Sequence, residues 1–127
     1  MNIIFTSLLS ILFALNTFLS IPFQEVKSAF EQGNADKIIA LGTTKMLISI
    51  KGKEGVYSKS QGKQVLKGFF TDYPPQSFSF RFRGEDKGTS SFAVGDYSSS
   101  IPFRISLKFK KSGNNHLIES VTIAAHE

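Results

Sequence analysis

The chain of 127 residues contains no cysteine and no tryptophan, and it has only two histidines. The absence of cysteine excludes structural disulfides, thiolate zinc sites, thiol catalysis and lipid attachment at a leader cysteine. It does not assign a compartment, because many envelope proteins fold without disulfides. His116 and His126 belong to no His/Asp/Glu cluster with metal-ligand spacing. We therefore expect no metal and no cofactor.

Sequence motifs for catalysis are also missing. The chain has no G-x-S-x-G nucleophile elbow and no glycine-rich phosphate loop. Gly52 and Gly55 flank a charged turn, Lys53-Glu54, and fit a hairpin better than a phosphate cradle. The sequence thus offers no established catalytic constellation.

Charged side chains are absent from residues 1–20, which form a largely apolar stretch. Its apolar core is too short to span a bilayer comfortably, which favours a secretory signal peptide. The stretch has no Lys or Arg and no clear A-x-A site, so an uncleaved anchor and a buried first helix remain alternatives. We expect cleavage near residues 16–20, export to the periplasm or medium, and one domain over residues 21–127.

The stretch Tyr57–Pro75 predicts one well-marked helix. Ser58 stands at the N-cap with Gln61 three residues later, which is the spacing of a capping box. Pro74-Pro75 prevents continuation. Its apolar positions recur with helical spacing and form one stripe. They are Gly62, Val65, Leu66, Phe69, Phe70 and Tyr73.

Shorter elements precede this helix. We predict a helix over Ile21–Gln32, with Pro22 at its first position and Ser20 as a possible cap. Gly33 ends it, and Asn34 caps a second helix over Ala35–Leu41, which Gly42 ends. A strand over Lys45–Lys51 follows, and Val56-Tyr57 leads into the central helix.

After Pro75 the apolar period changes from helical to two, which predicts four strands in a meander. Their ranges are Gln76–Gly84, Ser90–Ser98, Ile101–Lys111 and His116–Ala125. Alternation places two rows on the inner face: Phe78, Phe80 and Phe82, and then Phe103, Ile105, Leu107 and Phe109. It also groups Phe92 with Val94, and Leu117 with Val121 and Ile123. Helices on one face of an antiparallel sheet define an α+β domain.

This order resembles the nuclear-transport-factor-2-like (cystatin-like) superfamily, whose helices are wrapped by a curved antiparallel sheet. The chain also resembles an uncharacterised Bacteroidetes family, domain of unknown function 4783. The segments that carry the resemblance are Ile21-Pro22, Ala29-Phe30, Gly33-Asn34-Ala35, Val56-Tyr57-Ser58-Lys59-Ser60-Gln61, Val65-Leu66-Lys67, Phe69-Phe70, Pro74-Pro75, Phe82, Gly84 and Phe103-Arg104. The resemblance implies an NTF2-like cone and an envelope-type location, and it supplies no activity.

The superfamily cone often holds a small apolar ligand or an active site. Here it would place a ligand pocket among Phe69, Phe70, Phe80, Phe82, Phe103 and Ile105. Weak catalytic candidates are Asp96, Asp72 and Tyr57, because a pocket carboxylate with a tyrosine can catalyse proton transfer. The alternative for Asp96 is solvent exposure or pairing with Arg104. Tyr73 and Tyr97 are the other two tyrosines considered for such a site.

The net charge is +5. Arg81, Arg83, Arg104, Lys108 and Lys110 alternate with the apolar rows, which predicts one basic stripe on the outer sheet face. The stripe is a solvated surface, a patch for anionic polysaccharide or lipid, or a homodimer face. Nucleic acid is not expected, because the aromatic side chains needed for stacking alternate to the buried face.

Three functions follow. The first is non-enzymatic binding of a small apolar ligand in the cone, or of a protein partner through the sheet. The second is an isomerase or hydrolase that uses a pocket carboxylate and a tyrosine. The third is an envelope protein whose basic sheet face binds anionic components.

Overall fold

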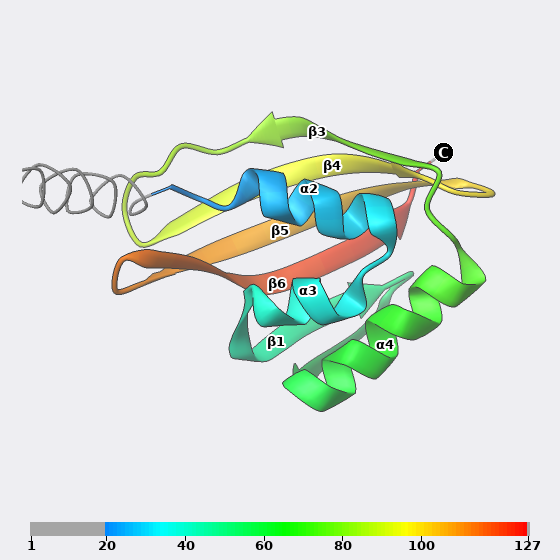
Figure 1. Ribbon diagram of the computed structural model, residues 1–127, viewed down its shortest axis with the longest axis horizontal. Helices are drawn as coiled ribbons and strands as arrows, with labels where there is room; N and C mark the ends of the chain where they lie inside the picture. Colours follow the sequence, from blue (N-terminus) through cyan, green and yellow to red (C-terminus); the bar gives the residue numbers. More distant parts are fainter. Residues whose placement is uncertain (1–19, 127) are drawn as a thin grey trace, which may run out of the picture.

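The computed structural model describes residues 20–126. The expected signal peptide and its cleavage region, apart from Ser20, lie outside the described residues. Within these residues three helices pack on one curved, six-stranded sheet, so the predicted α+β class is confirmed (Figure 1). The helices are α2 (Phe23–Gln32), α3 (Ala35–Ala40) and α4 (Lys59–Asp72). The strands are β1 (Gly42–Ile50), β2 (Lys53–Ser58), β3 (Ser77–Arg83), β4 (Ser90–Ser98), β5 (Pro102–Ser112) and β6 (Asn115–Ala125).

The sheet has the order β2-β1-β6-β5-β4-β3. Strands β3 to β6 form the predicted antiparallel meander, and β1 pairs in parallel with β6. Strand β2 was missed, because Val56-Tyr57 lies in an edge strand paired with β1 rather than in a lead-in to α4. Its side chains are mostly exposed, so no apolar alternation marks it.

The central helix begins as predicted. Ser58 Oγ accepts a hydrogen bond from the Gln61 N–H, and Gln61 Oε1 accepts one from the Ser58 N–H, both at 3.3 Å. The helix buries Gly62, Leu66, Phe69 and Phe70. A Cβ on Gly62 would lie 3.0 Å from the Ile39 side chain, so this glycine permits close packing of α3 and β1 on α4.

The first helix differs from the expectation at its start. Pro22 is the N-cap rather than the first helical residue, and no side chain caps α2, so Ser20 is not its cap. Gly33 ends it in the left-handed conformation, with φ of 62°, as predicted. Asn34 caps α3 through a 3.1 Å bond from the Lys37 N–H. Gly42 opens β1 instead of ending α3.

Aromatic side chains fill the space between α4, α2 and the sheet. Phe30 stacks on Phe78 at 5.1 Å between ring centroids, and Phe69 meets Phe103 edge to face at 5.1 Å. Tyr97 is fully buried, and its hydroxyl donates to the Tyr73 carbonyl over 2.6 Å. This region of the cone is therefore packed with the protein's own side chains.

Strand β3 contains a register shift that exchanges the sheet faces of its last two residues. Phe80 lies opposite Gly95, but Phe82 lies opposite Val94 and Arg83 opposite Ala93. The extra residue, Arg81, is a β-bulge. Phe82 is consequently 55% exposed on the outer face, and Arg83 shares the inner face with buried Ala93. The inward placement predicted for Phe82 and the outward placement predicted for Arg83 are both wrong.

The faces predicted for β4 and β6 have different outcomes. Phe92 and Val94 share a face, as predicted, but it is the outer one, and Phe92 is 55% exposed. On β6 a second register shift, across from Lys108 and Phe109, separates Leu117 from Val121. The inner residues of β6 are His116, Ile118, Val121 and Ile123.

Candidate functional site

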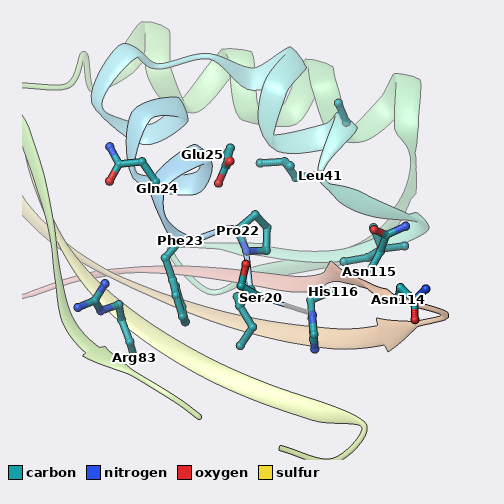
Figure 2. Close-up of a pocket in the computed structure, with 13 residues that line it drawn as sticks. Ser20, Pro22, Phe23, Gln24, Glu25, Leu41, Arg83, Asn114, Asn115 and His116 are labelled. Atoms are coloured by element: carbon teal, nitrogen blue, oxygen red, sulfur yellow. The ribbon is translucent and has the colours of Figure 1, made fainter. Parts of the chain in front are cut away.

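A pocket of about 590 Å³ lies at the end of the cone where α2 begins. Figure 2 shows its lining residues, which come from the start of α2, the end of α3, the last residue of β3 and the β5–β6 hairpin. We call it the end pocket. Its labelled residues are Ser20, Pro22, Phe23, Gln24, Glu25, Leu41, Arg83, Asn114, Asn115 and His116.

Phe23 separates the end pocket from the core. Its ring lies edge-on to Phe80 at 5.3 Å and to Phe109 at 5.9 Å. The Arg83 guanidinium lies over the same ring, 5.6 Å from its centroid. The β3 bulge therefore brings a cation to an aromatic wall, an arrangement that favours anionic or π-rich molecules beside it.

His116 is the most unusual side chain of this site. Its side chain is only 4% exposed, and its Nε2 lies 2.6 Å from Asp86 Oδ1 in the β3–β4 connection. This contact is an ion pair when the imidazole is protonated, whereas Nδ1 has no hydrogen-bond partner among the described residues. A buried polar group without a partner costs about 1–3 kcal/mol. Sequence reasoning missed this residue, because only the fold places it inward.

Charges of both signs surround the pocket. Glu25, in the first turn of α2, and Asp86 are acidic, whereas Arg83 is basic. A smaller hollow of about 280 Å³ adjoins it, shares Phe23, Gln24 and Arg83, and adds Lys27. The arrangement can hold a small amphipathic molecule with its polar group toward Arg83 and His116.

The residues predicted to line one ligand pocket do not line a common cavity. Phe103 and Ile105 are buried in the core, as is Phe70, and Phe82 faces outward. Phe80 reaches the smaller hollow, and Phe69 reaches a third hollow described below. The structure thus hollows the cone at Phe23 rather than among these side chains.

The catalytic candidates also lie in different parts of the molecule. Asp96 lies on the outer face, with its carboxylate 3.1 Å from Arg81 Nε and 3.7 Å from Arg104 Nε, so it is the ion-paired alternative that the structure adopts. Tyr97 is in the core, where burial raises the pKa of its hydroxyl far above the ordinary value. Neither residue faces a cavity.

Asp72 and Tyr57 both line the third hollow, which we call the α4 groove. It has a volume of about 490 Å³ and lies between α4 and the β1–β2 hairpin. Lys51 and Tyr73 also line it, with Lys51 Nζ 2.9 Å from Tyr73 Oη. No hydrogen bond joins Asp72 to a tyrosine among residues 20–126.

Two backbone features of the α4 groove are costly. Lys51 adopts φ of 53°, a left-handed conformation that costs a side-chain-bearing residue about 1–2 kcal/mol. Gly68 lies in the middle of α4, where glycine costs about 1 kcal/mol relative to alanine. A Cβ there would meet nothing within 4 Å, so no packing contact requires this glycine.

The five predicted basic residues do not form one stripe. Arg83 faces inward, and Arg81 and Arg104 are paired with Asp96. Lys108 lies 3.7 Å from Glu119, and Lys110 is exposed. Carboxylates on the same outer face therefore offset much of the expected positive charge.

Two properties of residues 20–126 limit the chemistry. No group of three or more His, Asp or Glu side chains is placed to hold a metal ion in this part of the chain. Its helices are all too short or too polar to cross a membrane.

Solved structures with the same fold come from several bacteria. A DUF4783 family protein from Bacteroides uniformis is 23% identical, with a TM-score of 0.79 over 85% of this chain and 99% of that one. A family protein from Bacteroides fragilis is 25% identical, with a TM-score of 0.77 over 84% and 100%. A domain with a cystatin-like fold from Nostoc punctiforme is 10% identical, with a TM-score of 0.64 over 83% and 73%.

No curated protein matches the chain. The family profile described as Domain of unknown function (DUF4783) matches residues 23–124, which includes all three helices and almost the whole sheet. The match agrees with the cystatin-like, NTF2-like cone already described. The chain therefore belongs to the DUF4783 family.

Proposed function

We propose that this protein is an exported, non-enzymatic binding domain that holds a small amphipathic ligand in the end pocket. The observation that carries the proposal is His116, a buried imidazole on the wall of this pocket whose Nδ1 has no hydrogen-bond partner among the described residues. A ligand group that bonds to Nδ1 would remove the cost of leaving this atom unsatisfied.

The remaining walls suit the same ligand. Ile21, Pro22, Phe23 and Leu41 supply apolar surface, and Arg83 supplies a cation. A volume near 590 Å³ falls within the range of about 300–1,000 Å³ that is typical of small-molecule sites. We infer an apolar body against Phe23 and an anionic or strongly polar group between Arg83 and His116.

Export rests on the apolar leader, residues 1–20. Ser20 and Ile21 line the end pocket, so cleavage directly before or after Ser20 would leave the new terminal ammonium close to it. The ammonium would add positive charge and favour an anionic ligand further.

Arg83→Gln and Arg81→Gln make a matched test, because the two arginines stand two residues apart on opposite faces of β3. The probe is a fluorescent fatty acid, titrated against the exported protein. We expect Arg83→Gln to weaken binding about tenfold or more and Arg81→Gln to leave it unchanged. Equal effects, or no binding by the unmodified protein, would refute the proposal.

A second candidate is a protein partner on the outer sheet face. Phe82 and Phe92 are each 55% exposed there, and Val94 is half buried beside them. Exposed aromatic side chains grouped on one face often mark a protein interface. Sedimentation equilibrium tests self-association: a homodimer should dissociate on Phe92→Ser, and a monomer at all concentrations would exclude the homodimer.

A further inference from the structure

We propose that the α4 groove is a second ligand site, separate from the end pocket, for a small apolar molecule that carries a carboxylate. The groove lies between the second half of α4 and the β1–β2 hairpin. Its apolar surface comes from Ile50, Val65 and Phe69, and its rim carries Lys51 and Lys53. Nothing in the end-pocket proposal uses these residues.

Gly68 is the first observation in favour of this site. Both Gly62 and Gly68 weaken α4, but only Gly62 has a packing reason, because Ile39 and Ile48 occupy the space beside it. The space beside Gly68 is empty, and it opens onto the groove. A ligand that lies across the helix backbone at this position would explain a glycine that the fold itself does not need.

Lys51 is the second observation. It is the one non-glycine residue of 20–126 with positive φ, in the two-residue loop Lys51-Gly52 between the paired residues Ile50 and Lys53. Loops of this kind favour asparagine, aspartate or glycine at both positions. Strained residues of this sort gather at functional sites. Here the unfavourable residue brings an ammonium to the groove, 2.9 Å from Tyr73 Oη.

The charged side chains that line the groove favour an anionic ligand. Lys51 and Lys53 outnumber the single carboxylate of the lining, Asp72, so the groove as a whole attracts an anion. The carboxylate would lie between the two ammonium groups and the Tyr73 hydroxyl. The apolar body would lie over Gly68 against Val65 and Phe69.

A structural role for Lys51 is the competing explanation. The last turn of α4 contains no basic residue, and a cation near a helix C-terminus is stabilising. In that case Lys51→Asn lowers the melting temperature. If Lys51 serves a ligand, Lys51→Asn relieves the unfavourable loop conformation and keeps or raises the melting temperature while binding is lost.

The probe is 2-naphthoate, with uncharged 2-naphthylmethanol as its matched control, titrated by calorimetry against the full protein. We expect naphthoate to bind at least tenfold more tightly than the alcohol. Gly68→Leu should weaken naphthoate binding at least tenfold while raising the melting temperature, because leucine favours the helix and fills the groove. Lys51→Asn should remove the preference for the acid, and Lys67→Asn, on the same helix outside the groove, should not.

Arg83→Gln separates the two sites. Naphthoate binding that survives Arg83→Gln but not Gly68→Leu supports the α4 groove whatever happens at the end pocket. Binding that Gly68→Leu leaves intact, a loss on Arg83→Gln alone, or a dissociation constant above 10 mM for the unmodified protein would overturn the proposal.

Discussion

Two phenylalanines of one strand provide a sharp test of the β3 bulge. Phe78 and Phe82 have the same side chain and stand an even number of residues apart, so simple alternation makes them equivalent. The register shift instead leaves Phe78 buried, at 3% exposure, and Phe82 outside, at 55%. Replacing each by alanine should therefore give very different losses of stability.

The magnitudes follow from the contacts. The Phe78 ring stacks on Phe30 and meets Phe80 edge to face, each at 5.1 Å, and it also fills the space beside Gly95. Truncating such a buried phenylalanine costs about 3–5 kcal/mol, because a cavity remains. Phe82→Ala should cost about 1 kcal/mol or less, as is usual for exposed positions.

Urea and thermal denaturation, each followed by circular dichroism, measure both variants. A change of 1 kcal/mol shifts the melting temperature of a domain of this size by about 4–8 °C, so the difference is large compared with experimental error. Both variants should keep the native spectrum at low temperature. Losses that agree within about 1 kcal/mol would mean that Phe82 is inside and that the bulge is wrong.

Three further predictions concern stability. Ser58→Ala should cost about 1 kcal/mol in urea denaturation, because the Gln61 N–H loses its acceptor, and a neutral effect would contradict the capping box. Tyr97→Phe should cost about 1–2 kcal/mol by the same assay, because the Tyr73 carbonyl loses its 2.6 Å bond, and an unchanged midpoint would contradict that bond. Asp36 should stabilise the protein above its unfolded pKa of 3.8 and lose this contribution as pH falls through its lowered folded pKa, because the Lys63 hydrogen bond favours the carboxylate. Melting curves should therefore fall less between pH 5 and pH 2 for Asp36→Asn than for the unmodified protein, and parallel curves would refute the link.

Local signals were sufficient for the helices and the meander. The capping box at Ser58, the left-handed Gly33 and the regular row from Phe103 to Phe109 each depend on residues close in sequence, and each is confirmed. The family resemblance was carried by the same segments. These elements needed no knowledge of distant contacts.

The site depends on register, which local patterns do not contain. Alternation assumes an unbroken ladder, so a single extra residue in β3 exchanged the expected faces of Phe82 and Arg83. Strand β6 misled the prediction for Leu117 in the same way. His116 acquires its significance only because the fold turns it inward beside Asp86.

The bulge at Arg81 creates both candidate surfaces of the sheet at once. Without it, Phe82 would extend the inner apolar row and Arg83 would join the outer cations. With it, the end pocket gains a guanidinium beside Phe23, and the outer face gains an aromatic ring near Val94. Bulges are frequently found beside functional sites, where they redirect side chains. Arg81 itself lies on the outer face, where it pairs with Asp96. One extra residue thus connects the proposed ligand site inside the cone with the proposed partner surface outside it, and deletion of Arg81 should impair both together.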